Sequence, residues 1–109
     1  MYQYNDIGYI VVNSSSKIEV VNINDFSSIA TITGFNSPRY FLPINNDKAY
    51  VTDLYANSIS IVDLNSNSIS GNINTNGWTE ELLMTNDTVY VCNRTGDNLL
   101  IIDPINDVL

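Results

Sequence analysis

The sequence predicts an all-β fold built from a repeated unit of four short strands. Two related motifs recur along the chain at spacings of 41 and then 40 residues. Runs of β-branched and aromatic residues alternate with clusters of Asn, Asp, Ser and Gly, which is typical of strands joined by tight turns. No window has the period of a helix. The repeat determines the architecture.

The first motif is centred on a tyrosine that occurs at Tyr9, Tyr50 and Tyr90. An Asn-Asp pair stands before each tyrosine, and small or β-branched residues follow it. The three copies superpose without gaps as segments 5–12, 46–53 and 86–93.

The second motif is an apolar run that ends in a polar residue, at Asn22, Asp63 and Asp103. Its three copies are segments 18–22, 59–63 and 99–103. They keep the phase of the tyrosine motif, so the chain is a tandem repeat.

Each repeat is expected to hold four strands. In the second repeat these strands are expected at 39–44, 48–53, 58–64 and 68–74, and the first repeat is expected to begin within its own innermost strand at 1–4. The intervening segments are rich in Asn and Asp, whose short side chains bond the nearby backbone and tolerate positive φ.

Four short strands within about 40 to 45 residues are typical of a β-propeller blade. Segments 59–62 and 99–102 are apolar on both strand faces, as a blade packed between two neighbours requires, whereas a strand with one wet face alternates more cleanly. The sequence therefore predicts a partial β-propeller of antiparallel blades, just under three in number. The chain is expected to be one segment, 1–109, with blades at about 1–34, 35–75 and 76–109.

Several of these residues resemble the YVTN β-propeller repeat of YncE-like and surface-layer-type proteins. Segment 50–53, Tyr-Val-Thr-Asp, differs from the naming tetrapeptide only in its last residue, and segment 90–93, Tyr-Val-Cys-Asn, only in its third. Segments 57–63 and 98–103 are similar to the family's third strand, and 34–38, Gly-Phe-Asn-Ser-Pro, is similar to its entry to the innermost strand. The resemblance covers essentially the whole chain and implies fold more strongly than function.

Members of that family usually close a ring of about seven blades, so fewer than three would leave two apolar faces and strand edges open. Three interpretations are left open: a piece of a longer chain, a homo-oligomer that completes a ring, or an open array.

Composition excludes several classes of function. Four Lys and Arg against twelve Asp and Glu give a net charge of −8, so no nucleic-acid partner is expected. The chain has no histidine, which removes His-dependent catalysis and His-ligated metals. A lone cysteine excludes an internal disulfide, and no apolar run is long enough for membrane insertion. No cofactor is expected. The family resemblance implies a secreted, periplasmic or cell-surface protein, and a cytoplasmic one is also compatible with the sequence.

Residues that recur in every repeat are expected to be structural. The three tyrosines are expected to pack between blades, and Asn22, Asp63 and Asp103 to cap turns. Cys92, at the position of Val11 and Thr52, is expected to be a small, half-buried core residue.

Residues that break the repeat are the candidate ligand-binding residues, because a structural role should recur in every blade. They combine aromatic and charged side chains expected on one loop face near the channel: Trp78, Tyr55, Arg39, Arg94, Glu80 and Glu81.

The leading functional hypothesis is a non-catalytic binding module that holds a protein or glycan on this loop face. One alternative is a propeller enzyme or cation-binding protein that uses carboxylates of Glu80, Glu81 and Asp53. Another is a structural surface repeat.

Overall fold

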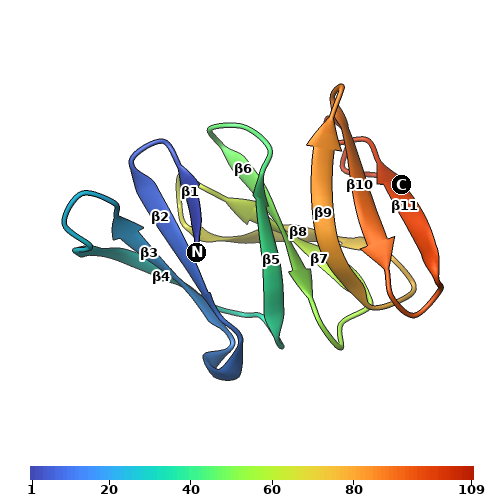
Figure 1. Cartoon of the computed structure of the whole chain (residues 1–109), viewed down its shortest axis with the longest axis horizontal. Helices are drawn as coiled ribbons and strands as arrows, with labels where there is room; N and C mark the ends of the chain where they lie inside the picture. The colour runs from blue at the N-terminus through green and yellow to red at the C-terminus, as the bar shows by residue number, and fades with distance from the viewer.

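The computed structural model describes all 109 residues as three antiparallel sheets that follow one another along the chain (Figure 1). Sheet 1 has the strand order β1-β2-β3-β4 and sheet 2 the order β5-β6-β7-β8, whereas sheet 3 has three strands in the order β9-β10-β11. The predicted all-β class and the four-stranded unit are confirmed.

The strands of sheet 1 are β1 (Tyr2–Tyr4), β2 (Ile7–Val12), β3 (Lys17–Asn22) and β4 (Ser28–Ile32), with a 3-10 turn η1 (Asn13–Ser15) after β2. Those of sheet 2 are β5 (Pro38–Pro43), β6 (Lys48–Asp53), β7 (Ser58–Asp63) and β8 (Ser68–Asn74). Those of sheet 3 are β9 (Thr79–Thr85), β10 (Thr88–Asn93) and β11 (Asn98–Ile102). In sheet 2 these bounds differ from the predicted strands by at most one residue at each end.

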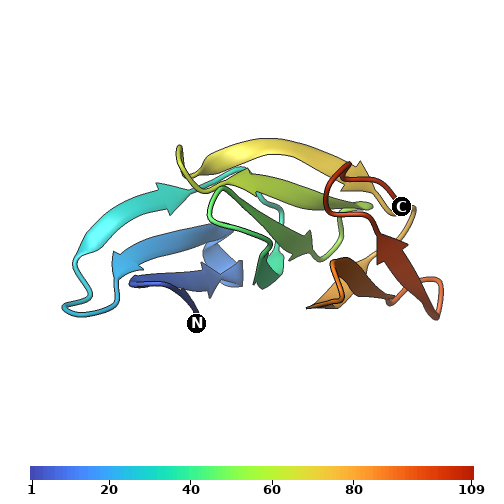
Figure 2. The ribbon, with the colours of Figure 1, turned by 90° about the horizontal axis from the view of Figure 1, so that it is seen from above.

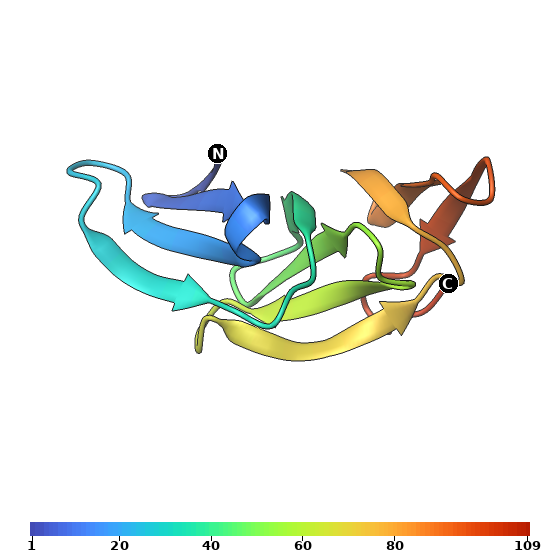
Figure 3. The same ribbon diagram turned by 90° about the horizontal axis from the view of Figure 1, so that it is seen from below.

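The sheets stand side by side in a curved row. Figures 2 and 3 show the first strands, β1, β5 and β9, on the inner side of the curve, and the fourth strands, β4 and β8, on the outer side. This arrangement of four-stranded units is that of propeller blades.

Two hydrophobic clusters hold neighbouring sheets together. Tyr9 of sheet 1 stacks on Phe41 of sheet 2 with ring centroids 4.3 Å apart. The other buried members of this first cluster are Ile18, Val20, Ile32, Phe35, Ala49, Val51 and Val62. The second cluster joins sheets 2 and 3 and consists of Tyr50, Ile59, Ile73, Val89, Val91 and Ile102. Sheet 2 therefore buries both of its faces, as its doubly apolar strands predict.

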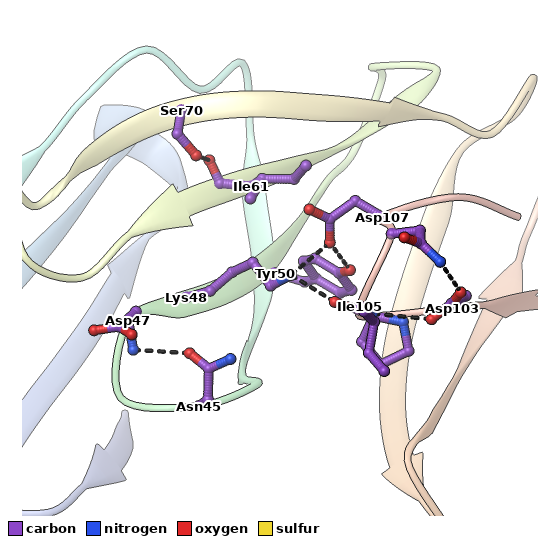
Figure 4. A network of polar contacts seen from close by, with 11 residues as sticks. Asn45, Asp47, Lys48, Tyr50, Ile61, Ser70, Asp103, Ile105 and Asp107 are labelled. Atoms are coloured by element: carbon purple, nitrogen blue, oxygen red, sulfur yellow. Dashed lines mark hydrogen bonds and ion pairs between the residues drawn. The ribbon is translucent and has the colours of Figure 1, made fainter.

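A polar clamp, made by Lys48, Tyr50 and Asp107, reinforces the contact between sheets 2 and 3. Lys48 Nζ lies 2.8 Å from Asp107 Oδ1 and also donates to the Pro104 carbonyl, and the Tyr50 hydroxyl donates to the same carboxylate (Figure 4). Burial, followed by the neighbouring Asp107, raises the pKa of Tyr50 above its ordinary value. The clamp fixes the turn after β11 against the first half of β6 in sheet 2.

The expectation that Cys92 is half-buried is wrong, because Cys92 is exposed. Its equivalent in the second repeat, Thr52, is fully buried because sheet 3 covers that face of sheet 2. The corresponding face of sheet 3 is uncovered, so the same strand position meets solvent.

Candidate functional site

The candidate residues come from three connecting segments at one end of sheets 2 and 3. Tyr55 lies in the β6–β7 turn, Trp78 ends the segment between β8 and β9, and Arg94 lies in the β10–β11 turn. These connections lie along the lower edge of the molecule in Figure 1. Arg39 and Glu80 are the second residues of β5 and β9, which begin at the same edge. We call these five residues the aromatic–arginine cluster.

An edge-to-face pair of aromatic rings forms one half of the cluster. The ring centroids of Tyr55 and Trp78 are 4.9 Å apart and the ring planes meet at 85°. Such pairs contribute about 0.5 to 1.5 kcal/mol beyond their area burial. Both side chains remain exposed, and 63% of Tyr55 is open to solvent. The pair is thus ordered by its own contact while its outer surface is free.

The backbone at Tyr55 has an uncommon conformation. Its φ is +70°, in the left-handed region that bulky residues rarely adopt. The Ala56 N–H donates to the Asp53 carbonyl at 3.1 Å and closes the turn around Tyr55. Buried Asp53 in turn accepts from the backbone N–H groups of Asn36 and Ser37. The presentation of this tyrosine therefore rests on a well-bonded turn.

Trp78 is held by bonds across the two neighbouring segments. The backbone N–H of Trp78 donates to Thr95 Oγ1 at 2.9 Å, and its backbone carbonyl accepts from the Arg94 backbone N–H at 2.7 Å. Gly77 packs directly on Asn93, because a Cβ at that position would lie 2.5 Å from Asn93 Oδ1. A side chain at 77 would force either the Asn93 side chain or the segment itself to shift, so the glycine permits the close approach that places Trp78.

Two arginines share one carboxylate in the other half of the cluster. Glu80 lies 3.4 Å from Arg39 and 3.6 Å from Arg94, measured between guanidinium nitrogens and carboxylate oxygens. The group holds two positive charges and one negative charge in a chain of net charge −8. Arg94 is the most exposed of the three side chains, so most of its N–H donors face solvent.

Glu81 does not belong to the cluster, although the sequence grouped it with the other five. The register of β9 against β10 shifts between Leu82 and Thr79, and Glu81 makes no ion pair with the two arginines that contact Glu80. Glu81 lines a hollow of about 410 Å³ on the open face of sheet 3 together with Leu82, Leu83, Tyr90, Cys92 and Leu99. Thr95, which anchors Trp78, was missed because a threonine in a polar turn has no distinctive sequence signal.

The recurring polar residues make the same local bond in each repeat. Asn22, Asp63 and Asp103 accept from the backbone N–H two residues later, at 2.9, 2.8 and 2.9 Å. The pKa of Asp103 is lowered, first by the Ile105 N–H and then by the Asn106 side chain. These side chains cap the turn after the third strand of each sheet.

The structure contains no group of three or more His, Cys, Asp or Glu side chains placed to hold a metal ion. It also contains no helix of the length and apolarity that crossing a membrane would require.

Solved structures with the same fold come from several bacteria. The hydrazine synthase of Kuenenia stuttgartiensis superposes with a TM-score of 0.84 and 16% identity over 94% of this chain and 31% of its own. Apo AztD from Citrobacter koseri superposes with a TM-score of 0.70 and 16% identity over 91% of this chain and 29% of its own. A protein of unknown function from Bacteroides caccae superposes with a TM-score of 0.73 and 16% identity over 94% of this chain and 43% of its own.

At these identities the likeness concerns the fold alone, and the fold is that of a β-propeller. The chain spans less than half the length of each of these three structures. No protein-family model matches the sequence, and no curated protein matches it.

Proposed function

We propose that this chain is part of a YVTN-type β-propeller that binds a protein or glycan ligand at the aromatic–arginine cluster without catalysing a reaction. The observation that carries the proposal is the exposed Tyr55–Trp78 pair, 4.9 Å between centroids, beside a guanidinium whose donors face solvent. We further propose that the protein acts outside the cytoplasm, as the family resemblance implies.

Support for the YVTN assignment comes from the placement of its motifs. The tetrapeptides at 50–53 and 90–93 lie in β6 and β10, the second strands of successive sheets. Each is followed by a turn that contributes to the cluster. The residues that resemble the family motif therefore build the framework, and the residues that depart from the repeat form the cluster.

The cluster has the chemistry of a recognition surface. Aromatic faces stack on the apolar face of a sugar ring or on an extended side chain, and such contacts dominate many binding energies. Arg94 supplies planar N–H donors for a hydroxyl, carbonyl or carboxylate. Because the two rings already contact each other, little side-chain freedom is lost when a ligand binds.

The surroundings of Glu80 favour binding over catalysis. A general base has to reach its substrate with a free carboxylate oxygen. Glu80 has an arginine on each side, Arg39 at 3.4 Å and Arg94 at 3.6 Å. Its carboxylate therefore serves to position the two guanidinium groups.

The test uses the sole tryptophan as its own reporter. Trp78 fluorescence is recorded while the chain is titrated with neutral and acidic oligosaccharides, and the chain is also applied to a glycan array. We expect a saturable fluorescence change with at least one glycan. The double variant Tyr55→Ala, Trp78→Ala should weaken array binding at least about tenfold, since tenfold corresponds to about 1.4 kcal/mol.

The matched control is Phe26→Ala. Phe26 is 58% exposed and also has positive φ, but it lies in the β3–β4 turn at the other end of the sheets. This variant should bind like the wild type. Equal binding by the double variant and the control would refute the site. A wild-type chain that binds no glycan on the array and no member of a library of cell-surface protein segments would refute the proposed function.

A further inference from the structure

The face of sheet 3 that points away from sheet 2 is apolar and open. We call it the front face; its residues are Glu81, Leu83, Tyr90, Cys92, Leu99 and Ile101. Leu83 is 62% exposed and Leu99 is 56% exposed. A hollow of about 410 Å³ lies on this surface. Apolar surface gathered in this way is typical of interaction sites.

The internal repeat indicates what this face is built to contact. In sheet 2 the same positions, 40 residues earlier, are Tyr50, Thr52, Ile59 and Ile61. Tyr50, Thr52 and Ile59 are fully buried, and Tyr50 and Ile59 pack on sheet 3. The front face of one sheet is thus the surface that receives the next sheet.

The next sheet contributes a recurring set of small or apolar residues on its back face, which packs on the front face of the sheet before it. Sheet 2 offers Ala49, Val51 and Val62 to sheet 1, and sheet 3 offers Val89, Val91 and Ile102 to sheet 2. At the equivalent positions sheet 1 has Gly8, Ile10 and Val21. Gly8 pairs with Val21 in the sheet, so both point away from the Tyr9 side. Gly8 and Val21 are buried, with the Met1 and Ile23 side chains beside Gly8, so these two side chains form part of the same back face. One molecule therefore carries an open front face and a matching apolar back face.

We propose that two copies of this chain associate front to back, with the front face of sheet 3 in each copy packed on the back face of sheet 1 in the other. The contact continues the stacking already made twice within the chain. Two copies of three sheets give six, within the range of about four to eight blades that propellers use, whereas three copies would give nine. A two-fold axis makes both contacts equivalent and closes the assembly.

Charge sets the conditions for association. Each copy has a net charge of −8, so the copies repel each other at long range. Glu81 is the only charged residue of the front face. On the back face Lys17 pairs with Glu19 at 3.1 Å. The contact itself is close to neutral, and added salt should strengthen the dimer by screening the long-range repulsion.

Light scattering in the presence of a reductant tests the proposal, since reductant prevents a disulfide through exposed Cys92. We expect a mass of about 24 kDa, twice the 12.2 kDa of one chain. Leu99→Lys should reduce the mass to that of one chain, because it places a charge in the contact. Ile105→Lys is the matched control: Ile105 is also apolar and is more exposed than Leu99, but it lies outside the front face, so this variant should leave the dimer intact.

A second measurement keeps the test independent of folding defects. Alkylation of Cys92 should slow as concentration rises in the wild type but not in Leu99→Lys, whose circular dichroism should remain that of a β protein. A wild-type mass of one chain at every concentration would overturn the proposal. A ladder of larger species would overturn ring closure, and an intact Leu99→Lys dimer would overturn the choice of face.

Discussion

Tyr50 and Tyr90 occupy the same place in successive repeats, yet Tyr50 is fully buried and Tyr90 is only partly buried. The same contrast separates Thr52 from Cys92 and Ile59 from Leu99. The strands have matching sequences and matching registers, so the local structure is shared. What differs is that sheet 2 has a neighbour on each face and sheet 3 has one. In a stacked repeat, burial belongs to the pair of neighbouring units and not to the strand alone.

The largest expected effect comes from removing the two equivalent tyrosines in turn. Tyr50→Ala leaves a cavity between sheets 2 and 3 and should lower the free energy of unfolding by about 3 to 5 kcal/mol. Tyr90→Ala should cost about 1 kcal/mol, because its ring has no sheet on the open side. Urea denaturation, at a concentration where the chain is monomeric, measures both values.

Equal losses for the two tyrosine variants would contradict the difference in burial. If Tyr50→Ala does not fold, Ile59→Val and Leu99→Val repeat the comparison on a smaller scale. Ile59→Val should cost about 1 kcal/mol, and Leu99→Val should have little effect.

The polar clamp is a second difference between the repeats. Lys48 occupies the position of Ile7 and Thr88, so sheet 2 alone has a lysine there. Lys48→Met removes the bonds to Asp107 and the Pro104 carbonyl and should lower stability by about 1 to 3 kcal/mol. Amide exchange at residues 103–108 should accelerate as that turn is released.

Lys17→Met is the control for the clamp. Its ion pair with Glu19 is surface-exposed, so the loss should be at most about 1 kcal/mol. A loss for Lys48→Met no larger than that for Lys17→Met would mean that the clamp does not stabilise the contact.

The smallest expected effect is the response to alkaline pH. The pKa of Tyr50 is raised in the folded state, so the folded protein holds this proton more tightly than the unfolded chain does. Its contribution to stability is complete below the unfolded pKa of about 10 and is lost as pH rises above that value.

Burial also raises the pKa of Tyr2 and Tyr9. The free energy of unfolding of the wild type should therefore fall from pH 9 to 11, and that of Tyr50→Phe should fall less over the same range. Urea midpoints at several pH values measure the two slopes. Identical slopes for wild type and Tyr50→Phe would contradict a shifted pKa for Tyr50.

Much of the fold could be predicted from sequence because it depends on local patterns. The spacing of Tyr9, Tyr50 and Tyr90 predicts the length of the repeat unit, and the clusters of Asn and Asp predict the positions of the turns. The clamp could not be predicted in this way, since Lys48 and Asp107 are 59 residues apart in sequence and the lysine does not recur in the other repeats. Long-range pairs of this kind depend on how whole sheets are stacked.

The candidate site was predicted in part. Sequence indicated that Tyr55, Trp78 and Arg94 lie in loops, because each interrupts the repeat between two strands. The edge-to-face contact and the shared Glu80 carboxylate required the relative placement of sheets 2 and 3. Glu81 breaks the repeat as Glu80 does, but only Glu80 pairs with the two arginines, and no sequence pattern distinguishes the two residues.

The repeat, the strand class and the turn positions follow from the amino-acid sequence alone, because strand alternation and turn chemistry act over a few residues. The tertiary structure decided which equivalent residues are buried, which aromatic and charged side chains meet, and which sheet face stays open. Those outcomes depend on contacts between sheets, and an identical strand is core or surface according to what packs against it.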